Sequence, residues 1–182
     1  MKHPVTKLFL ARIRALAAAQ RGAGQHRGPP TLAGPFERHM IAIERNAAGR
    51  FAIVAAGETV ASLLGRPVIG AAAASLFAEI DRPRIESMLA AAMSERVGCA
   101  FGAEARWSRF HATPVEAMLA PESSLTGLRR ASVCLISFRY RRRHGARALP
   151  PLSLLSERYV ELDGFAGSRE SRPERHGLRA GQ

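Results

Sequence analysis

Residues 43–51 read IERNAAGRF and join two short runs rich in apolar residues. These runs, residues 39–44 and 50–55, alternate loosely between apolar and polar side chains, as strands do. The connection between them, residues 46–49, reads NAAG, and its final glycine favours a tight turn. The stretch therefore predicts a β-hairpin at the start of a domain.

Three short helices are expected after the hairpin, at residues 57–64, 71–79 and 81–96. Apolar residues recur in each segment at the spacing of a buried helix face. Asp81 is expected at the N-cap of the third helix, with Pro83 in its first turn.

Three strands are expected next, at residues 97–108, 111–119 and 131–140. The period-two pattern places one set of side chains on the core face, namely Val97, Cys99, Phe101, Ala103, Ala105 and Trp107, followed by His111, Thr113, Val115, Ala117 and Leu119. Glu116 has the opposite parity and is expected to face outward. The fold class is therefore α+β, with a five-stranded antiparallel sheet and its short helices on one face.

The chain has 182 residues, a length that suits one domain with tails. The expected organisation is an amphipathic helix at 1–20, a linker at 21–35 and a domain at 36–144. The remainder, 145–182, is expected to be a mostly disordered tail with a short helix near 152–162.

One face of the N-terminal helix is apolar and comprises Val5, Leu8, Phe9, Ile13, Leu16 and Ala17. A helix of this kind docks on its own domain or on a second copy, which would give a homodimer. Its basic residues also allow a second interpretation, in which the helix lies on an anionic membrane surface.

The formal net charge of +12 comes from two blocks. Residues 1–30 contribute +6 and residues 123–147 contribute +7, whereas the segment between them is close to neutral. Arg139, Arg141, Arg142 and Arg143 follow the last expected strand and are the basic contact candidates. They are interpreted as a solvated end, as a contact with an acidic partner protein, or as a contact with nucleic acid.

Several motifs resemble those of one family in their order and spacing. They are IERNAAGRF at 43–51, AGETV at 56–60, LGRPVIG at 64–70, Asp81-Arg82, and PVEAMLAP at 114–121. This order resembles a family of PAS-like proteins found mainly in alphaproteobacteria, whose domain long had no assigned function. The N-terminal region lacks the tryptophan and the acidic segment typical of that family, so the chain resembles a divergent member.

The resemblance implies a small-ligand pocket between the sheet and the helices. The pocket candidates are Leu63, Phe77, Met88, Phe101, His111 and Met118. No cofactor can be named. Flavin–cysteinyl photochemistry is not expected because residues 57–66 contain no cysteine, and haem is not expected because residues 81–96 contain no histidine. Cys99 and Cys134 are interpreted as packing residues.

The sequence contains no catalytic constellation and no metal-ligand spacing. No apolar run approaches the roughly 20 residues that a membrane-spanning helix needs. We therefore expect a single-domain, non-enzymatic, cytoplasmic sensory, regulatory or protein-interaction module that signals by binding a ligand or a partner protein. The alternatives are a basic nucleic-acid-associated protein and a peripheral membrane-surface protein attached through the N-terminal helix.

Overall fold

The computed structural model describes residues 3–22, 36–95, 97–122, 130–137 and 148–162. In chain order the elements are α1 (Pro4–Gly22), η1 (Glu37–His39), β1 (Met40–Arg45), β2 (Phe51–Ala56), α2 (Glu58–Leu64), η2 (Ala73–Leu76), η3 (Glu79–Asp81), α3 (Arg82–Glu95), β3 (Gly98–Ser108), β4 (His111–Glu122), β5 (Arg130–Ser137) and β6 (Leu152–Val160), where η marks a short 3-10 helix.

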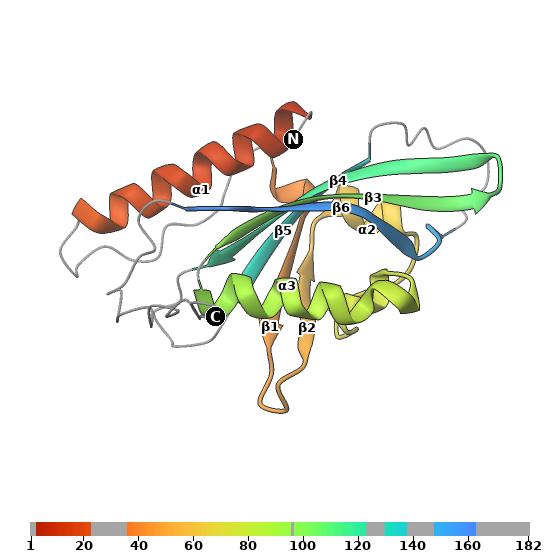
Figure 1. Ribbon diagram of the computed structural model, residues 1–182, viewed down its shortest axis with the longest axis horizontal. Coiled ribbons are helices and arrows are strands. Elements are labelled where there is room, and N and C mark those ends of the chain that lie inside the picture. The colour runs from red at the N-terminus through yellow and green to blue at the C-terminus, as the bar shows by residue number, and fades with distance from the viewer. Residues whose placement is uncertain (1–2, 23–35, 96, 123–129, 138–147, 163–182) are drawn as a thin grey trace, which may run out of the picture.

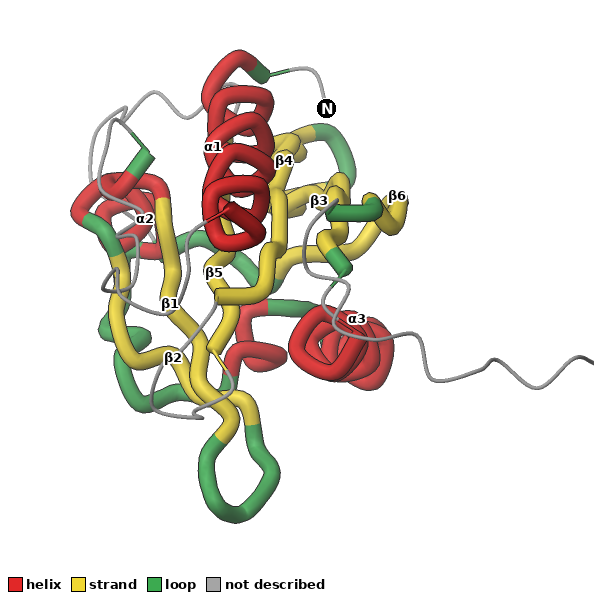
Figure 2. The backbone as a smooth tube through the Cα atoms, turned by 90° about the vertical axis from the view of Figure 1, so that its left-hand side faces the viewer, coloured by secondary structure: helices red, strands yellow, loops and turns green. Residues whose placement is uncertain are grey.

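The described strands form one sheet in the order β2-β1-β5-β4-β3-β6, with every neighbouring pair antiparallel. The α+β class and the antiparallel sheet are confirmed, but the sheet has six strands rather than five. Figure 1 and Figure 2 show α1 and α3 on opposite sides of this sheet. The sheet is therefore the middle layer of three.

The β1–β2 hairpin forms as its sequence predicts. Gly49 adopts a φ of 79°, which an L side chain rarely takes, and its N–H donates to the carbonyl of Asn46 over 2.9 Å. The side-chain oxygen of Asn46 accepts the N–H of Arg50 at 2.9 Å. The guanidinium of Arg45 lies 5.7 Å from the ring centroid of Phe51, which joins the two strand ends by a cation–π contact.

The helices between β2 and β3 differ in part from the prediction. α2 lies where it is expected, but residues 71–79 contain η2 and the start of η3 instead of one α-helix. α3 follows Asp81 and buries the apolar stripe Ile85, Met88, Leu89 and Ala92 against the sheet. The short 3-10 helices turn the chain sharply, so that Leu76 and Phe77 are both buried in the same core.

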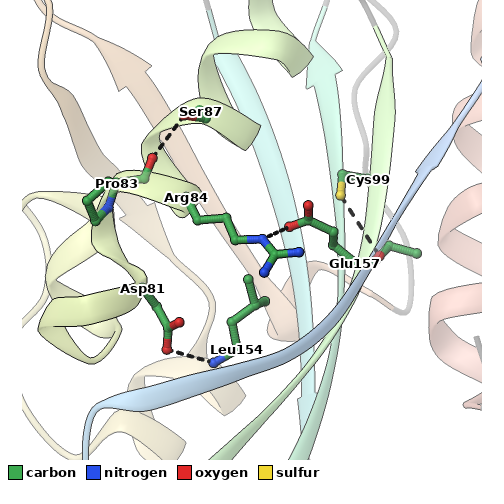
Figure 3. Close-up of polar contacts among 8 residues, drawn as sticks. Asp81, Pro83, Arg84, Ser87, Cys99, Leu154 and Glu157 are labelled. Atoms are coloured by element: carbon green, nitrogen blue, oxygen red, sulfur yellow. Dashed lines mark hydrogen bonds and ion pairs between the residues drawn. The ribbon is translucent and has the colours of Figure 1, made fainter.

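The segment expected to hold a short helix near 152–162 is instead the strand β6, paired with β3. The carbonyl of Leu152 accepts the N–H of Ala78 at 2.8 Å. The Asp81 carboxylate accepts the N–H of Leu154 at 3.0 Å, and Arg84 pairs with Glu157 at 2.8 Å (Figure 3). The prediction was wrong because these partners come from distant parts of the chain, and local apolar spacing does not reveal them.

The pairing of β6 with β3 contains one irregularity. Gly102 pairs with Ser156 and Ala103 pairs with Leu154, so Leu155 is an extra residue on β6. This arrangement is a β-bulge, and the Leu155 side chain is 62% exposed.

The remaining domain boundaries lie largely outside the described residues. α1 extends to Gly22, two residues past its expected end. Residues 23–35 of the expected linker and residues 163–182 of the expected tail belong to the part of the chain that the structure does not describe.

Gly57 precedes α2 and lies against the backbone of η1. A Cβ atom at Gly57 would be 2.7 Å from the carbonyl carbon of Arg38 and would also meet the carbonyl oxygen of Glu37. The φ of Gly57 is −69°, so an alanine there would meet a steric conflict and no backbone strain.

We therefore expect Gly57→Ala to lower the free energy of unfolding by about 1–3 kcal/mol, the usual cost of overpacking. Urea unfolding followed by circular dichroism measures it. Gly102→Ala is the matched control, because its Cβ would meet only the Ser156 hydroxyl, at 3.0 Å, which can rotate away. Equal stabilities of the two variants would contradict the expectation.

Candidate functional site

A small cavity lies between the sheet, η2 and α3. This side of the sheet is its inner face, and the side that α1 covers is its outer face. The volume of the cavity is about 30 Å³. Its walls comprise Ile41, Ile43, Ala73, Leu76, Phe77, Ile85, Met88, Leu89, Phe101, Leu119, Val133 and Leu135. All of these side chains are apolar, so the cavity offers no group that could donate, accept or transfer a proton.

The size of the cavity limits what it can hold. Pockets for drug-sized ligands and cofactors usually measure roughly 300–1,000 Å³, about tenfold or more above this volume. Small apolar cavities of this kind stay dry. The Phe77 and Phe101 rings lie 5.9 Å apart at a tilt of 57°, and Met88 is a flexible side chain beside them. A larger ligand would enter only if these side chains moved apart.

Three of the six pocket candidates from the sequence line this cavity: Phe77, Met88 and Phe101. Leu63 on α2 is buried in the same core but is not part of the cavity wall.

The other two candidates, Met118 and His111, lie elsewhere. Met118 is fully buried on the opposite face of the sheet, because it has the parity of Glu116 and not that of Leu119. His111 is exposed, because β4 begins beyond the region that the helices cover.

Most of the cavity wall lies outside the set of pocket candidates predicted from the sequence. Leu119, Val133 and Leu135 line it from β4 and β5. Strand parity would have identified Leu119, which the alternation already placed on the core face. The contribution of η2 depends on how the chain turns after β2, and no local pattern specifies that path.

The opposite face of the sheet is covered by α1. Phe9, Leu10 and Ile13 are buried there against a second apolar cluster that includes Met118 and Cys134. The helix thus docks on its own domain, one of the two arrangements expected for it. Leu8, predicted on the apolar face, is instead 55% exposed, and the side chains of Leu16 and Ala17 are outside the described part.

Glu116 on β4 holds the beginning of α1. The prediction placed it outward, and it does lie on the outer face, but α1 covers it and leaves only 9% exposed. Its carboxylate accepts a hydrogen bond from the Thr6 hydroxyl and the N–H of His3, the latter at 3.2 Å. A carboxylate is favourable at this end of a helix because the unpaired backbone N–H groups there carry partial positive charge.

The two cysteines are free and buried on opposite faces of the sheet. Burial raises the pKa of the Cys134 thiol to about 12, with a contribution from the nearby Glu116 carboxylate. Burial also raises the pKa of the Cys99 thiol to about 11. Both thiols are therefore protonated and poorly nucleophilic near neutral pH.

An open groove of about 490 Å³ runs between α1 and β6 on the outer face. Leu10 and Arg14 border it from α1, and Ala100 lies on β3. Arg158 and its neighbours up to Glu161 border it from the β6 side. The groove thus combines apolar surface with charged groups of both signs and directly adjoins α1.

The sequence predictions also concern the arginine block, a metal site and a membrane-spanning helix. Arg139, Arg141, Arg142 and Arg143 lie outside the described residues. Within the described ranges, no three His, Cys, Asp or Glu side chains gather to hold a metal ion. No described helix combines the length and the apolar character needed to cross a bilayer.

Solved structures and a family model resemble parts of this chain. The PAS domain of a protein from Colwellia psychrerythraea is 15% identical, with a TM-score of 0.42, and the alignment covers 57% of this chain and 90% of that one. A fungal LOV domain photoreceptor is 12% identical, also with a TM-score of 0.42, over 68% of this chain and 88% of that one. No curated protein matches the chain. The family model of the PAS domain matches residues 29–134, more than half of the 182 residues. This match includes β1 to β4 and most of β5, and the chain therefore belongs to the PAS domain family.

Proposed function

We propose that the chain is a non-enzymatic sensory or regulatory module in which a ligand or a partner protein changes the docking of α1. One observation carries this proposal: the cavity wall and the α1 contact surface are built from adjacent residues of the same strands. Leu119, Val133 and Leu135 face the cavity, whereas Met118 and Cys134 face α1. The alphaproteobacterial affiliation and the divergence of the chain within its family remain predictions.

The alternation of side chains along β4 and β5 couples the two faces of the sheet mechanically. Neighbouring residues of a strand point to opposite faces, so a strand that moves to enlarge the cavity also shifts its side chains beneath α1. The strands β4 and β5 are central in the sheet and closely packed on both sides. Closely packed interiors transmit such displacements instead of absorbing them.

The polar contact at the start of α1 makes its docking a switchable step. The hydrogen bonds of Glu116 to Thr6 and His3 must break when the helix leaves. The groove between α1 and β6 gives a partner protein direct access to the helix, since Leu10 and Arg14 border it. We propose a homodimer through the apolar face of α1 only for the undocked state. When the helix is docked, Phe9 and Ile13 contact their own sheet.

Two further features support this class of function. The cavity wall contains only apolar side chains, which suits binding and offers no acid, base or nucleophile. Two free, buried thiols fit the reducing cytoplasm, where we propose that the protein acts.

Cys134 provides a direct test of α1 docking. In a Cys99→Ala background, we expect the native Cys134 thiol to react slowly with a disulfide reagent such as DTNB, because it is buried under α1 with a raised pKa. Glu116→Ala removes a charged hydrogen-bond acceptor, an interaction worth about 1.5–3 kcal/mol, and is expected to raise the rate constant per thiolate about tenfold or more. The rate is compared per thiolate because loss of this carboxylate also lowers the pKa of Cys134.

Glu122→Ala is the matched control for this variant. Glu122 is a carboxylate on the same strand, and it accepts a hydrogen bond from the Ser132 hydroxyl on β5. It is expected to leave the Cys134 rate nearly unchanged. Equal rates in the two variants would show that Glu116 does not hold the helix.

Coupling across the sheet can be tested from the cavity side. Leu119→Ala enlarges the cavity and is expected to destabilise the protein by about 2–5 kcal/mol. If β4 couples the two faces, the variant also accelerates modification of Cys134, although Leu119 does not face α1. Thiol kinetics and urea unfolding on the same samples separate the two effects.

Leu63→Ala is the control for Leu119→Ala. It truncates an equally buried leucine of the same core that is not part of the cavity wall. At similar loss of stability, we expect a smaller rise in the Cys134 rate. The same rise in both variants would mean that global loosening, rather than β4, exposes the thiol.

A further inference from the structure

The hairpin formed by β3 and β4 extends beyond the rest of the sheet. Ala105 is the last residue of β3 that pairs with β6, opposite Leu152. Val115 is the first residue of β4 that pairs with the described part of β5, opposite Ser137. Among the described residues, the ribbon from 106 to 114 therefore has no strand on either side, and Figure 1 shows it reaching past the other elements.

Two aromatic side chains are displayed on this ribbon. Phe110 is 77% exposed at the turn and Trp107 is 37% exposed beside it. The register shifts between Arg106 and Ser108, so Trp107 is the extra residue of a bulge, a feature that redirects a side chain. The indole N–H of Trp107 donates to the Thr113 hydroxyl at 3.1 Å, which holds the ring in place.

The charge on the ribbon is positive. The guanidinium of Arg109 lies 4.6 Å from the centroid of the Phe110 ring and makes no ion pair with any described residue. Arg106 pairs with Glu104, and His111 is exposed at the start of β4. Residues 105–115 contain no acid, and the whole chain has a formal net charge of +12.

We propose that the β3–β4 tip, comprising Trp107, Arg109 and Phe110, docks on an anionic lipid surface. Aromatic rings are favoured at the boundary between headgroups and acyl chains, and a neighbouring arginine keeps its charge among the headgroups while its stem lies along apolar surface. The net positive charge draws the chain to a membrane of opposite sign. A protruding tip can meet a flat surface without displacing any other element.

The same side chains are less suited to nucleic acid. Bases stack on free aromatic faces, and one face of the Phe110 ring is already covered by Arg109. The site is also separate from the one behind the proposed signalling role, since neither α1 nor the cavity wall includes residues 106–114. Each proposal can therefore fail without the other.

Trp107 is the only tryptophan of the chain, so its fluorescence reports on this site alone. We expect vesicles of equal parts phosphatidylcholine and phosphatidylserine to co-sediment the 182-residue chain at low salt and to shift Trp107 emission to the blue. Vesicles of phosphatidylcholine alone are expected to do neither. Added salt should weaken the binding, because it screens the attraction between the cationic tip and the lipid charge.

Two variants test the tip itself. Phe110→Ser removes an exposed ring and is expected to lower the partition coefficient about tenfold. Arg109→Glu reverses a charge at the surface and is expected to lower it by a similar factor. Ile80→Ser is the matched control, because Ile80 is 88% exposed on η3, outside the ribbon, and its loss should leave binding unchanged.

Three results would overturn the proposal. The first is the absence of co-sedimentation with anionic vesicles at low salt. The second is co-sedimentation without a shift of Trp107 emission, or equal binding by Phe110→Ser and the parent chain. Either result would place the membrane contact elsewhere, such as on α1. The third is a shift of Trp107 emission on adding a DNA duplex or single strand but not on adding anionic vesicles, which would assign the tip to nucleic acid.

Discussion

The central strands β4 and β5 are buried on both faces, and this constraint organises the whole molecule. Every described side chain from Val115 to Pro121 and from Ala131 to Ile136 is buried. Strands with one buried face need a single partner layer, whereas these need two. α2 and α3 with η2 supply one layer, and α1 supplies the other. The N-terminal helix is therefore part of the fold, and its removal would leave apolar side chains such as Met118 and Ile136 facing water.

The contact between Glu116 and α1 gives that second layer its specificity. Apolar packing alone allows a helix to slide or rotate, since hydrophobic contacts have little directional preference. Burying a carboxylate is costly unless it is hydrogen-bonded, and in the docked position the Thr6 hydroxyl and the His3 N–H both bond Glu116 Oε1. The same contact makes docking sensitive to change, because loss of either donor removes a hydrogen bond to a buried carboxylate.

Much of the fold follows from local sequence, and the exceptions have identifiable causes. Asn46 and Gly49 specify the hairpin turn, and the alternation in β3 and β4 assigns most side chains to the correct face. That parity already separates Met118 from the cavity, so its placement among the pocket candidates was an error of assignment. β6 was beyond local reasoning, because its partners Ala78, Asp81 and Arg84 come from far along the chain. The burial of Glu116 was likewise hidden, because parity assigns a face but does not show what covers that face.

The bulge at Leu155 has a consequence for the behaviour of the protein at high concentration. β6 is the outermost described strand on its side of the sheet. Near its start, Ala78 and Asp81 bond the outward backbone groups of Leu152 and Leu154, but farther along no described strand lies beside it. A regular strand in that position is a template for joining one molecule to the next, which is how many β proteins begin to aggregate. The extra residue interrupts the regular spacing of donors and acceptors that a second strand would have to match. The irregularity thus makes the edge of β6 a poor template for pairing with a second molecule.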